Sequence, residues 1–292
     1  MSAGHPLRAA IWMIGAIVSF TSMAVAGRAL AGELDTFEIM TYRSLIGIVL
    51  VVSAARLAGT LGQVTGRSLH IHFIRNISHF TGQNLWFYAV TAAPLAQVFA
   101  LEFTSPLWVT VFAPLILGER LTGTRALAAL LGFFGILFVA QPDAASGFSP
   151  GLIAAAFAAV GFAGSAIFTR LLTRTETITC ILFYLTVMQA AFGLITAGID
   201  GDIAWPSLTA WPWLVLVGCA GLVAHFCLTK ALGIAPATVV MPIDFARLPI
   251  IALVGMAFYG EPLEIAVLIG AVIIFSANYL NIRTESRAAT SR

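Results

Sequence analysis

Ten apolar runs, each about as long as a membrane-spanning helix, follow one another along this chain and leave little sequence for anything else. A spanning helix needs roughly 20 mostly apolar residues. The runs fall near residues 9–30, 37–57, 71–92, 95–118, 124–141, 150–171, 178–198, 211–233, 237–259 and 263–282. Strands of a membrane barrel would alternate apolar and polar residues, whereas these runs are continuously apolar. The sequence therefore predicts an all-α integral membrane protein with ten transmembrane helices and no separate soluble domain.

Composition excludes several other classes of protein. Of the 292 residues, 60% are hydrophobic and 10% are charged, more apolar surface than a soluble domain of this length could bury. The basic residues are scattered along the chain, which excludes a nucleic-acid partner. Cys180, Cys219 and Cys227 lack the paired spacing of metal or redox sites. We interpret them as packing residues and predict neither a metal nor a cofactor.

The charges in the short loops predict the topology. Placing the N-terminus inside puts most basic residues on the cytoplasmic side, as the positive-inside rule requires. These residues are Arg8, Arg56, Arg67, Arg120, Arg125, Arg170, Arg174, Lys230, Arg283, Arg287 and Arg292. The opposite loops are acidic, with only Arg28 near that face. We therefore expect a multi-pass protein of the cell inner (plasma) membrane with both termini in the cytoplasm.

Segments 142 residues apart resemble each other, which indicates an internal repeat. At this single offset the matched pairs include Pro94 with Pro236, Gly118 with Gly260, Glu119 with Glu261, Glu102 with Asp244 and Arg28 with Arg170. Each repeat holds five spans, an odd number, so the second must enter the membrane from the opposite side. We predict two inverted five-helix repeats, 9–142 and 149–284, and a cytoplasmic tail, 285–292; such repeats are typical of secondary transporters.

The same residues resemble a known family. The features that carry the resemblance are Tyr42-Arg43, Ala93-Pro94, Ser105-Pro106, the run 117–121 (LGERL), and in the second half Ala235-Pro236, the run 259–263 (YGEPL) and Gly270. Each half is similar to an EamA-type domain, and the whole chain is identified as a member of the drug/metabolite transporter superfamily. The resemblance implies a ten-helix bundle whose pathway is lined chiefly by helices 1, 3, 4, 6, 8 and 9. Leu185 stands at the repeat position of Arg43, so a symmetric arginine pair is not expected.

A polar stripe runs along the third span. Arg75, His79 and Gln83 follow i, i+4, i+8 spacing, and Asn76 and Trp86 lie on neighbouring positions. An ionisable side chain in the membrane interior costs at least about 2.5 to 3.5 kcal/mol, so such residues should face a cavity or one another. We predict that the stripe lines the pathway. The alternative is a buried structural network in which Arg75 binds carbonyl groups at the helix end.

Two repeat-related carboxylates lie deep in the fourth and ninth spans. Asp244 is followed one turn later by Arg247, so an intrahelical ion pair is one interpretation there, and substrate binding by both residues is the other. Glu102 has no basic neighbour in the sequence. We therefore predict that Glu102 either carries proton coupling or attracts a cationic group, with Arg75 or Arg43 as a candidate cross-helix partner.

Prolines interrupt the same two spans. Pro106 lies close to Glu102, and Pro242 and Pro249 lie on either side of Asp244. Interrupted helices at corresponding places in two repeats point to a transporter site, so we predict hinges at these prolines; a static kink is the alternative.

His225 occupies the repeat position of Gln83, so the two side chains are predicted to face one cavity, although a lone membrane histidine is often a packing residue. Glu119 and Glu261 each follow a glycine at the end of a span. We expect them to accept hydrogen bonds from the helix-start amides of the next span.

A secondary transporter best explains these features. No GxxxxGK[ST] loop for ATP is present, and neither HExxH nor GxSxG supports the alternative of an intramembrane enzyme. A channel is the other alternative, but nothing resembles a filter. We predict alternating access, proton-coupled or gradient-driven, for a small metabolite such as an amino acid, a nucleoside-like cofactor, a vitamin or an amphiphilic drug-like solute. The expected partners are this solute and the lipid bilayer, and a homodimer is left open.

Overall fold

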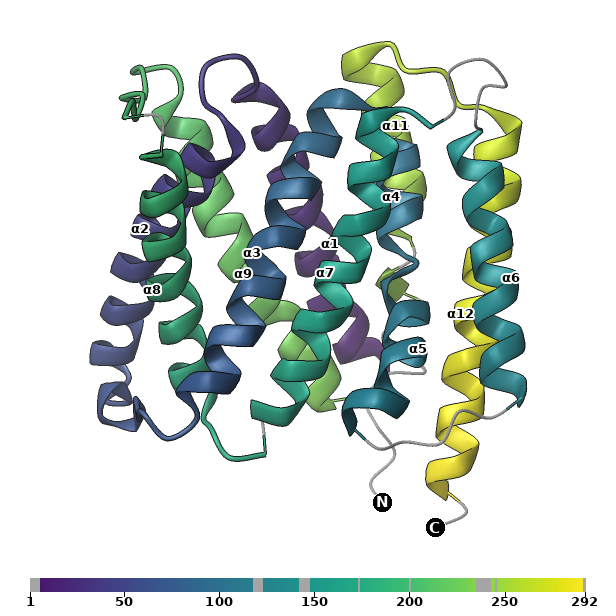
Figure 1. The fold of residues 1–292 in the computed structure, drawn as a ribbon, viewed down its shortest axis with the longest axis horizontal. Coiled ribbons are helices and arrows are strands. Elements are labelled where there is room, and N and C mark those ends of the chain that lie inside the picture. Colours follow the sequence, from purple (N-terminus) through teal and green to yellow (C-terminus); the bar gives the residue numbers. More distant parts are fainter. Residues whose placement is uncertain are drawn as a thin grey trace.

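The computed structural model describes residues 6–117, 123–141, 148–172, 174–199, 201–234, 243–244 and 246–290, and within them it contains helices and loops but no strand. The helices are α1 (Pro6–Ala29), α2 (Thr36–Leu57), η1 (Leu61–Gln63), α3 (Leu69–Ala92), α4 (Leu95–Glu102), α5 (Ser105–Leu117), α6 (Gly123–Ala140), α7 (Pro150–Leu172), α8 (Ile178–Ala197), α9 (Trp211–Ile234), α11 (Arg247–Tyr259) and α12 (Ile265–Thr290). They form one bundle (Figure 1). The expected all-helical class is confirmed over the described residues.

Helix starts recur at the offset seen in the sequence. The starts of α2 and α8, of α3 and α9, of α5 and α11, and of α6 and α12 are each 142 residues apart. Packing follows the same relation, because α1 contacts α9 while α3 contacts α7, and α2 and α6 contact their own counterparts α8 and α12. The beginning of α1 and the end of α12 lie at the same end of the bundle (Figure 1).

Five helices among the described residues are long and apolar enough to cross a membrane, namely α1, α2, α7, α8 and α9. The 24-residue α3 is long enough as well, but its polar stripe makes it less apolar. Its outer face carries Phe73, Ile77 and Tyr88, each nearly half exposed, while every residue of the stripe is buried. The helix is thus apolar outside and polar inside, as expected for a helix between lipid and a polar interior.

Small residues let α3 and α7 approach closely. A Cβ atom added at Gly161 would lie 2.7 Å from Cα of Gly82 and 2.9 Å from the carbonyl oxygen of Ser78. These neighbours are backbone atoms that cannot rotate away. Glycine is therefore required at this crossing, as in many membrane helix pairs.

The predicted fourth span is broken in two. The helix α4 ends at Glu102 and α5 begins at Ser105, so Phe103 and Thr104 interrupt it. The interruption frees a carbonyl at Phe103, and Nδ2 of Asn278 from α12 donates a hydrogen bond to it over 2.6 Å. Side-chain amides commonly satisfy a backbone opened within a membrane in this way. In the second half, α11 likewise begins only at Arg247, just after Asp244.

Candidate functional site

The two helix interruptions place opposite charges together in the interior. Nη2 of Arg247 lies 3.1 Å from Oε1 of Glu102 and 3.2 Å from Oδ2 of Asp244. Arg247 and Asp244 are only 4% and 5% exposed. One guanidinium therefore joins the carboxylates of α4 and of the segment before α11, and we call Glu102, Asp244 and Arg247 the acidic cluster.

Aromatic rings enclose the guanidinium of Arg247. Its Cζ lies 4.7 Å from the ring centre of Phe20, 5.2 Å from that of Phe99 and 4.9 Å from that of Phe103. These distances allow cation–π attraction, which strengthens where water is excluded. The rings come from α1, α4 and the interruption after α4, so three segments fix the position of one cation.

These contacts correct one prediction and confirm another. The ion-pair partner of Glu102 is Arg247, and neither Arg75 nor Arg43. Arg247 can reach Glu102 because α11 packs against α4. The expected pair of Asp244 with Arg247 within the same span is present. The ion pair within the ninth span does not exclude a contact with the fourth span, since Arg247 binds the carboxylates of Asp244 and Glu102 at once.

Trp86 holds the carboxylate of Glu102 through a hydrogen bond. Its Nε1 donates a hydrogen bond to Oε2 of Glu102 over 2.8 Å, and the side chain is 2% exposed. The indole packs edge-on against Phe87 and Phe99. Both oxygens of the Glu102 carboxylate therefore have a partner, one an arginine and one a tryptophan.

A second cluster gathers around His79, and we call His79, Gln189, His225, Arg75 and Arg43 the basic cluster. Nδ1 of His79 and Nε2 of Gln189 are 2.6 Å apart, and the ring centres of His79 and His225 are 6.0 Å apart. Arg43, Arg75 and Arg247 all lie within electrostatic range of His225. No carboxylate among the described residues forms an ion pair with Arg43 or Arg75.

Among the described residues, Arg75 belongs to a buried hydrogen-bond network of side chains and donates to no helix-end carbonyl group. Its Nε donates to the Thr169 hydroxyl over 3.1 Å, and its Nη1 donates to Oδ1 of Asn76 over 2.9 Å. Asn76 in turn donates to the carbonyl oxygens of His72 and Tyr184. The network joins α3 to α7 and α8, so Arg75 both faces inward and ties the halves together.

Phe20 connects the two clusters. Its ring packs edge-on against His225, with centres 5.6 Å apart, and also faces Arg247. Beside the basic cluster lies a small cavity of about 20 Å³, which Arg43, Thr186, Gln189 and His225 help to line. That volume holds about one water molecule and no metabolite, so a solute does not fit in this cavity in this conformation.

Gln83 and the three predicted hinge prolines are the remaining candidate residues. Gln83 is buried, its Nε2 has no hydrogen-bond partner, and whether it shares a cavity with His225 stays a prediction. Pro106 and Pro249 lie in the first turns of α5 and α11, so each follows an interruption instead of bending a continuous helix. Pro242 lies outside the described residues. Whether these prolines act as hinges also stays a prediction.

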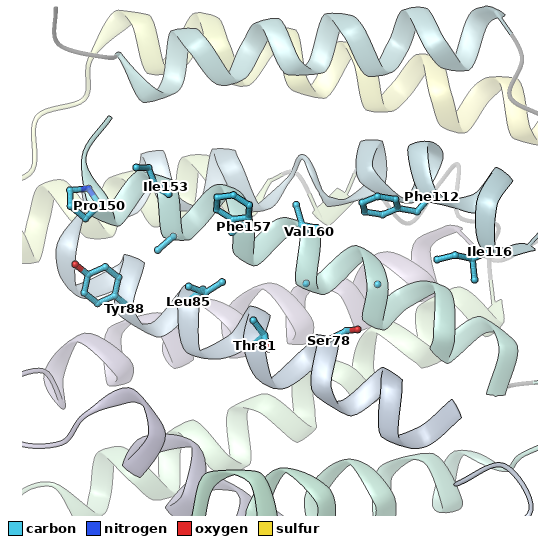
Figure 2. Close-up of a pocket in the computed structure, with 13 residues that line it drawn as sticks. Ser78, Thr81, Leu85, Tyr88, Phe112, Ile116, Pro150, Ile153, Phe157 and Val160 are labelled. Atoms are coloured by element: carbon cyan, nitrogen blue, oxygen red, sulfur yellow. The ribbon is translucent and has the colours of Figure 1, made fainter. Parts of the chain in front are cut away.

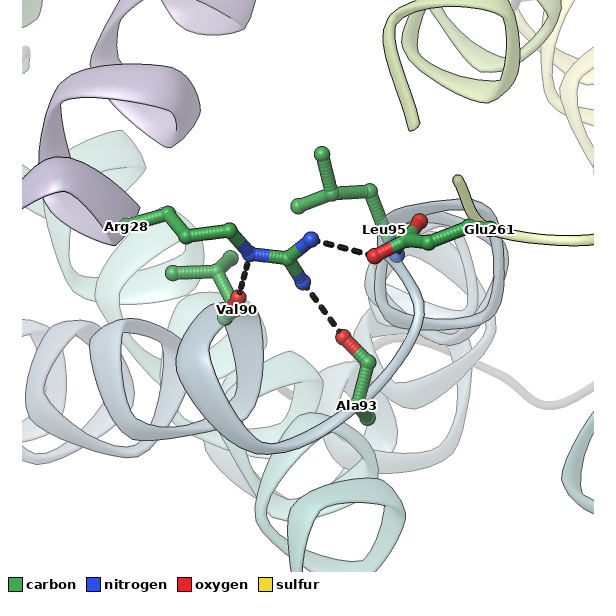
Figure 3. A network of polar contacts seen from close by, with 5 residues as sticks. All are labelled: Arg28, Val90, Ala93, Leu95 and Glu261. Atoms are coloured by element: carbon green, nitrogen blue, oxygen red, sulfur yellow. Dashed lines mark hydrogen bonds and ion pairs between the residues drawn. The ribbon is translucent and has the colours of Figure 1, made fainter. Parts of the chain in front are cut away.

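An ion pair joins the halves at one end of the bundle. Arg28 at the end of α1 pairs with Glu261 and donates to the carbonyl oxygens of Val90 and Ala93 over 2.5 and 2.6 Å (Figure 3). Oε2 of Glu261 accepts a hydrogen bond from the Leu95 amide over 2.8 Å. Glu261 thus binds a helix-start amide as expected, but that of α4 rather than of the next span. Glu119 lies outside the described residues.

A larger hollow than the cavity beside His225 lies away from these clusters. It is a groove of about 770 Å³ between α3, α5 and α7, lined by side chains such as Leu85, Phe112 and Phe157 (Figure 2). The lining is almost entirely apolar. It lacks the charged groups that would orient a polar metabolite.

Sequence reasoning missed Gln189 and Phe20 and underrated Arg43. Gln189 offered a usable signal, because an amide inside an apolar span is as unusual as Gln83. Phe20 offered none, since phenylalanine is common in membrane helices. The resemblance implied a pathway lined chiefly by the first, third, fourth, sixth, eighth and ninth spans. Arg43 and Gln189 place α2 and α8, which are the second and seventh spans, at the basic cluster as well.

Broken helices that meet at buried charges, in a bundle of repeated apolar helices, define a membrane transporter. The EamA-like transporter family matches residues 7–141 and again 149–283, and the chain belongs to this family. It is 25% identical to an S-adenosylmethionine uptake transporter of Rickettsia bellii, over 96% of this chain and 95% of the relative. It is 31% identical to a riboflavin transporter of Brucella anthropi, over 87% of this chain and 89% of the relative.

A solved structure shares the fold of the chain. That protein is 20% identical, and the match has a TM-score of 0.64 over 96% of this chain and 98% of the other. Together with the family match, these likenesses identify a multi-pass membrane protein that transports a small metabolite.

Proposed function

We propose that the chain is a secondary transporter of a zwitterionic metabolite in the bacterial inner membrane, and that it works by alternating access between two inverted five-helix repeats. Recurring helix starts and the reciprocal packing of α1 on α9 and α3 on α7 support a two-fold relation between the repeats. The common position of both chain ends supports an even number of spans, which we take to be ten, with both termini in the cytoplasm (Figure 1). The protein is not an enzyme in this proposal.

The main support for a zwitterionic solute is that acidic and basic side chains form two separate clusters in the interior. The acidic cluster holds two carboxylates around one guanidinium, while Arg43 and Arg75 in the basic cluster have no carboxylate partner among the described residues. A solute with a cationic group and an anionic group a few ångströms apart would complement both sides. Phe20 lies between the clusters, where a planar part of such a solute could stack.

Alternating access follows from the lack of space. The cavity of about 20 Å³ beside His225 cannot hold a metabolite, so the halves must separate before a solute enters. Arg28 with Glu261 holds one end closed in this conformation. A solute that binds the acidic and basic clusters together would favour the conformation in which they remain close.

Glu102 is the proposed coupling residue. With both carboxylates ionised, the acidic cluster carries one net negative charge, because Arg247 is the cation in contact with both. Uptake of one proton, or of the cationic group of the solute, neutralises this charge and avoids part of the cost of a charge in the membrane. Proton and solute would then exchange at the same carboxylate.

Counterflow in proteoliposomes tests the proposal in either transport direction. Vesicles loaded with unlabelled S-adenosylmethionine should accumulate the labelled compound, which carries a zwitterionic amino-acid group, faster than riboflavin-loaded vesicles accumulate riboflavin, which does not. Glu102→Gln should weaken solute binding but leave it measurable, and it should abolish accumulation driven by a proton gradient. Glu264→Gln changes an exposed carboxylate at the start of α12 and is the matched control.

Three results would contradict the proposal. A preference for riboflavin would exclude a zwitterion-selective site. Accumulation by Glu102→Gln under a proton gradient would remove the coupling role. Flux that does not saturate with concentration would favour a channel.

A further inference from the structure

Three metal-ligand side chains meet where α3 begins and α8 begins, apart from the two clusters described above. His72 lies in the first turn of α3, Glu176 in the loop before α8 and Cys180 in the first turn of α8. One donor atom from each residue lies within 4.8 Å of the others. We propose that His72, Glu176 and Cys180 bind a divalent transition metal, with Zn²⁺ as the expected ion.

The donor geometry is close to that of a zinc site. Sγ of Cys180 lies 3.9 Å from Nε2 of His72. Tetrahedral zinc with bonds of about 2.0 to 2.3 Å places neighbouring ligand atoms roughly 3.3 to 3.8 Å apart. A small side-chain movement would therefore bring the sulfur and nitrogen to coordination distance of one ion.

Two of the three side chains have buried polar atoms without partners. His72 is 0% exposed, and its Nδ1 has no hydrogen-bond partner. Oε1 of Glu176 is also buried and without a partner. Such atoms are costly unless something binds them, and a metal held by the Glu176 carboxylate would bind Oε1. The fully buried His72 imidazole would bind the metal through Nε2, the nitrogen that lies close to the Cys180 sulfur.

Neighbouring groups form hydrogen bonds with Glu176 and Cys180. Oε2 of Glu176 accepts a hydrogen bond from the Thr65 hydroxyl over 2.9 Å, which leaves Oε1 for a metal. The Cys180 thiol donates weakly to the Thr65 carbonyl over 3.6 Å, a contact that metal binding would replace.

The chemistry of the donors selects the ion. Thiolate and imidazole favour Zn²⁺ over Mg²⁺ or Ca²⁺, which prefer oxygen ligands. Three protein ligands leave a fourth position for water, as in zinc sites that exchange ligands. Because all three ligands must be deprotonated, binding should release protons.

The position of the site suggests what the metal does, and this consequence rests on the proposed function. His72 belongs to the first half of the chain, whereas Glu176 and Cys180 belong to the second. A bound ion would hold the halves together at this end of the bundle. Zn²⁺ should therefore slow transport by disfavouring the conformation that is open there.

Co²⁺ binding to the purified full chain in detergent tests the site without any transport assay. Thiolate-bound Co²⁺ gives an intense near-ultraviolet charge-transfer band, which Zn²⁺ should displace. Cys219→Ala with Cys227→Ala removes the other two thiols and should leave the band unchanged. Cys180→Ser should abolish the band, and Glu176→Gln should weaken Co²⁺ affinity at least about tenfold.

Metal-free melting temperatures check that each variant folds, and Glu176→Gln in the loop is the safer variant if Cys180→Ser is unstable. Binding without the thiolate band, or equal affinity in Glu176→Gln, would place the metal elsewhere and overturn the site. Absence of binding at 100-fold molar excess would overturn it as well. None of these results depends on whether the chain transports a zwitterion.

Discussion

Arg247→Gln is the substitution that most directly tests the acidic cluster. It removes the cation from two ion pairs of 3.1 and 3.2 Å and leaves two carboxylates facing each other in the interior. Breaking a buried pair from one side costs about 3 to 5 kcal/mol, because a charge remains without compensation. The loss of contacts with three aromatic rings adds to this cost. We therefore expect the melting temperature to fall by on the order of 10 °C.

The fall in melting temperature is measured by heating the purified protein and monitoring its unfolding with size-exclusion chromatography. Glu102→Gln is the matched control, because it leaves Arg247 with Asp244 and keeps an oxygen that can accept from Trp86. Its effect should be much smaller. Equal losses in both variants would refute the ion-pair reasoning.

Three other predictions concern the fold. Reporter fusions after Arg292 and near Gln63 should be cytoplasmic and one near Ser146 external; an external C-terminus would contradict two repeats of five helices. Gly161→Ala should destabilise the protein by about 1 to 3 kcal/mol in a thermal melt, because its Cβ would meet backbone of α3, whereas Gly62→Ala, which has open space, should not. Glu261→Gln should lower the melting temperature more than Glu264→Gln, because it weakens the pair with Arg28; equal effects would argue against that contact.

Local patterns in the sequence predicted the parts of the site that lie on one element. The spacing of Arg75 and His79 predicted a polar face on one helix, and this face is buried as expected. The short separation of Asp244 and Arg247 predicted their ion pair, and prolines predicted the region of the interruption after Glu102. Each of these features depends only on helix geometry within a few residues.

Contacts between helices could not be predicted in the same way. The pairing of Glu102 with Arg247 depends on how α4 and α11 are rotated and shifted against each other, and no local pattern contains that information. Trp86 illustrates the same limit, because an indole in a membrane helix can stack or donate, and only the position of Glu102 decides between them. Likewise His72 lies close to the carboxylate of Glu176, which is 104 residues away in the sequence, where no spacing rule applies.

The two repeats differ at the position of His79, and this difference leads to a last prediction. Glu102 and Asp244 correspond at the 142-residue offset, but Gly221 stands at the repeat position of His79. A Cβ at Gly221 would lie 3.2 Å from Nη2 of Arg43, so the glycine makes room for that guanidinium. Because the atom it would touch is the end of a flexible side chain, Gly221→Ala should change stability little and instead displace Arg43 from the basic cluster. We expect weaker binding of a zwitterionic probe, measured by ligand-induced thermal shift, with an almost unchanged melting temperature of the free protein; full retention of binding would show that Arg43 is not part of the site.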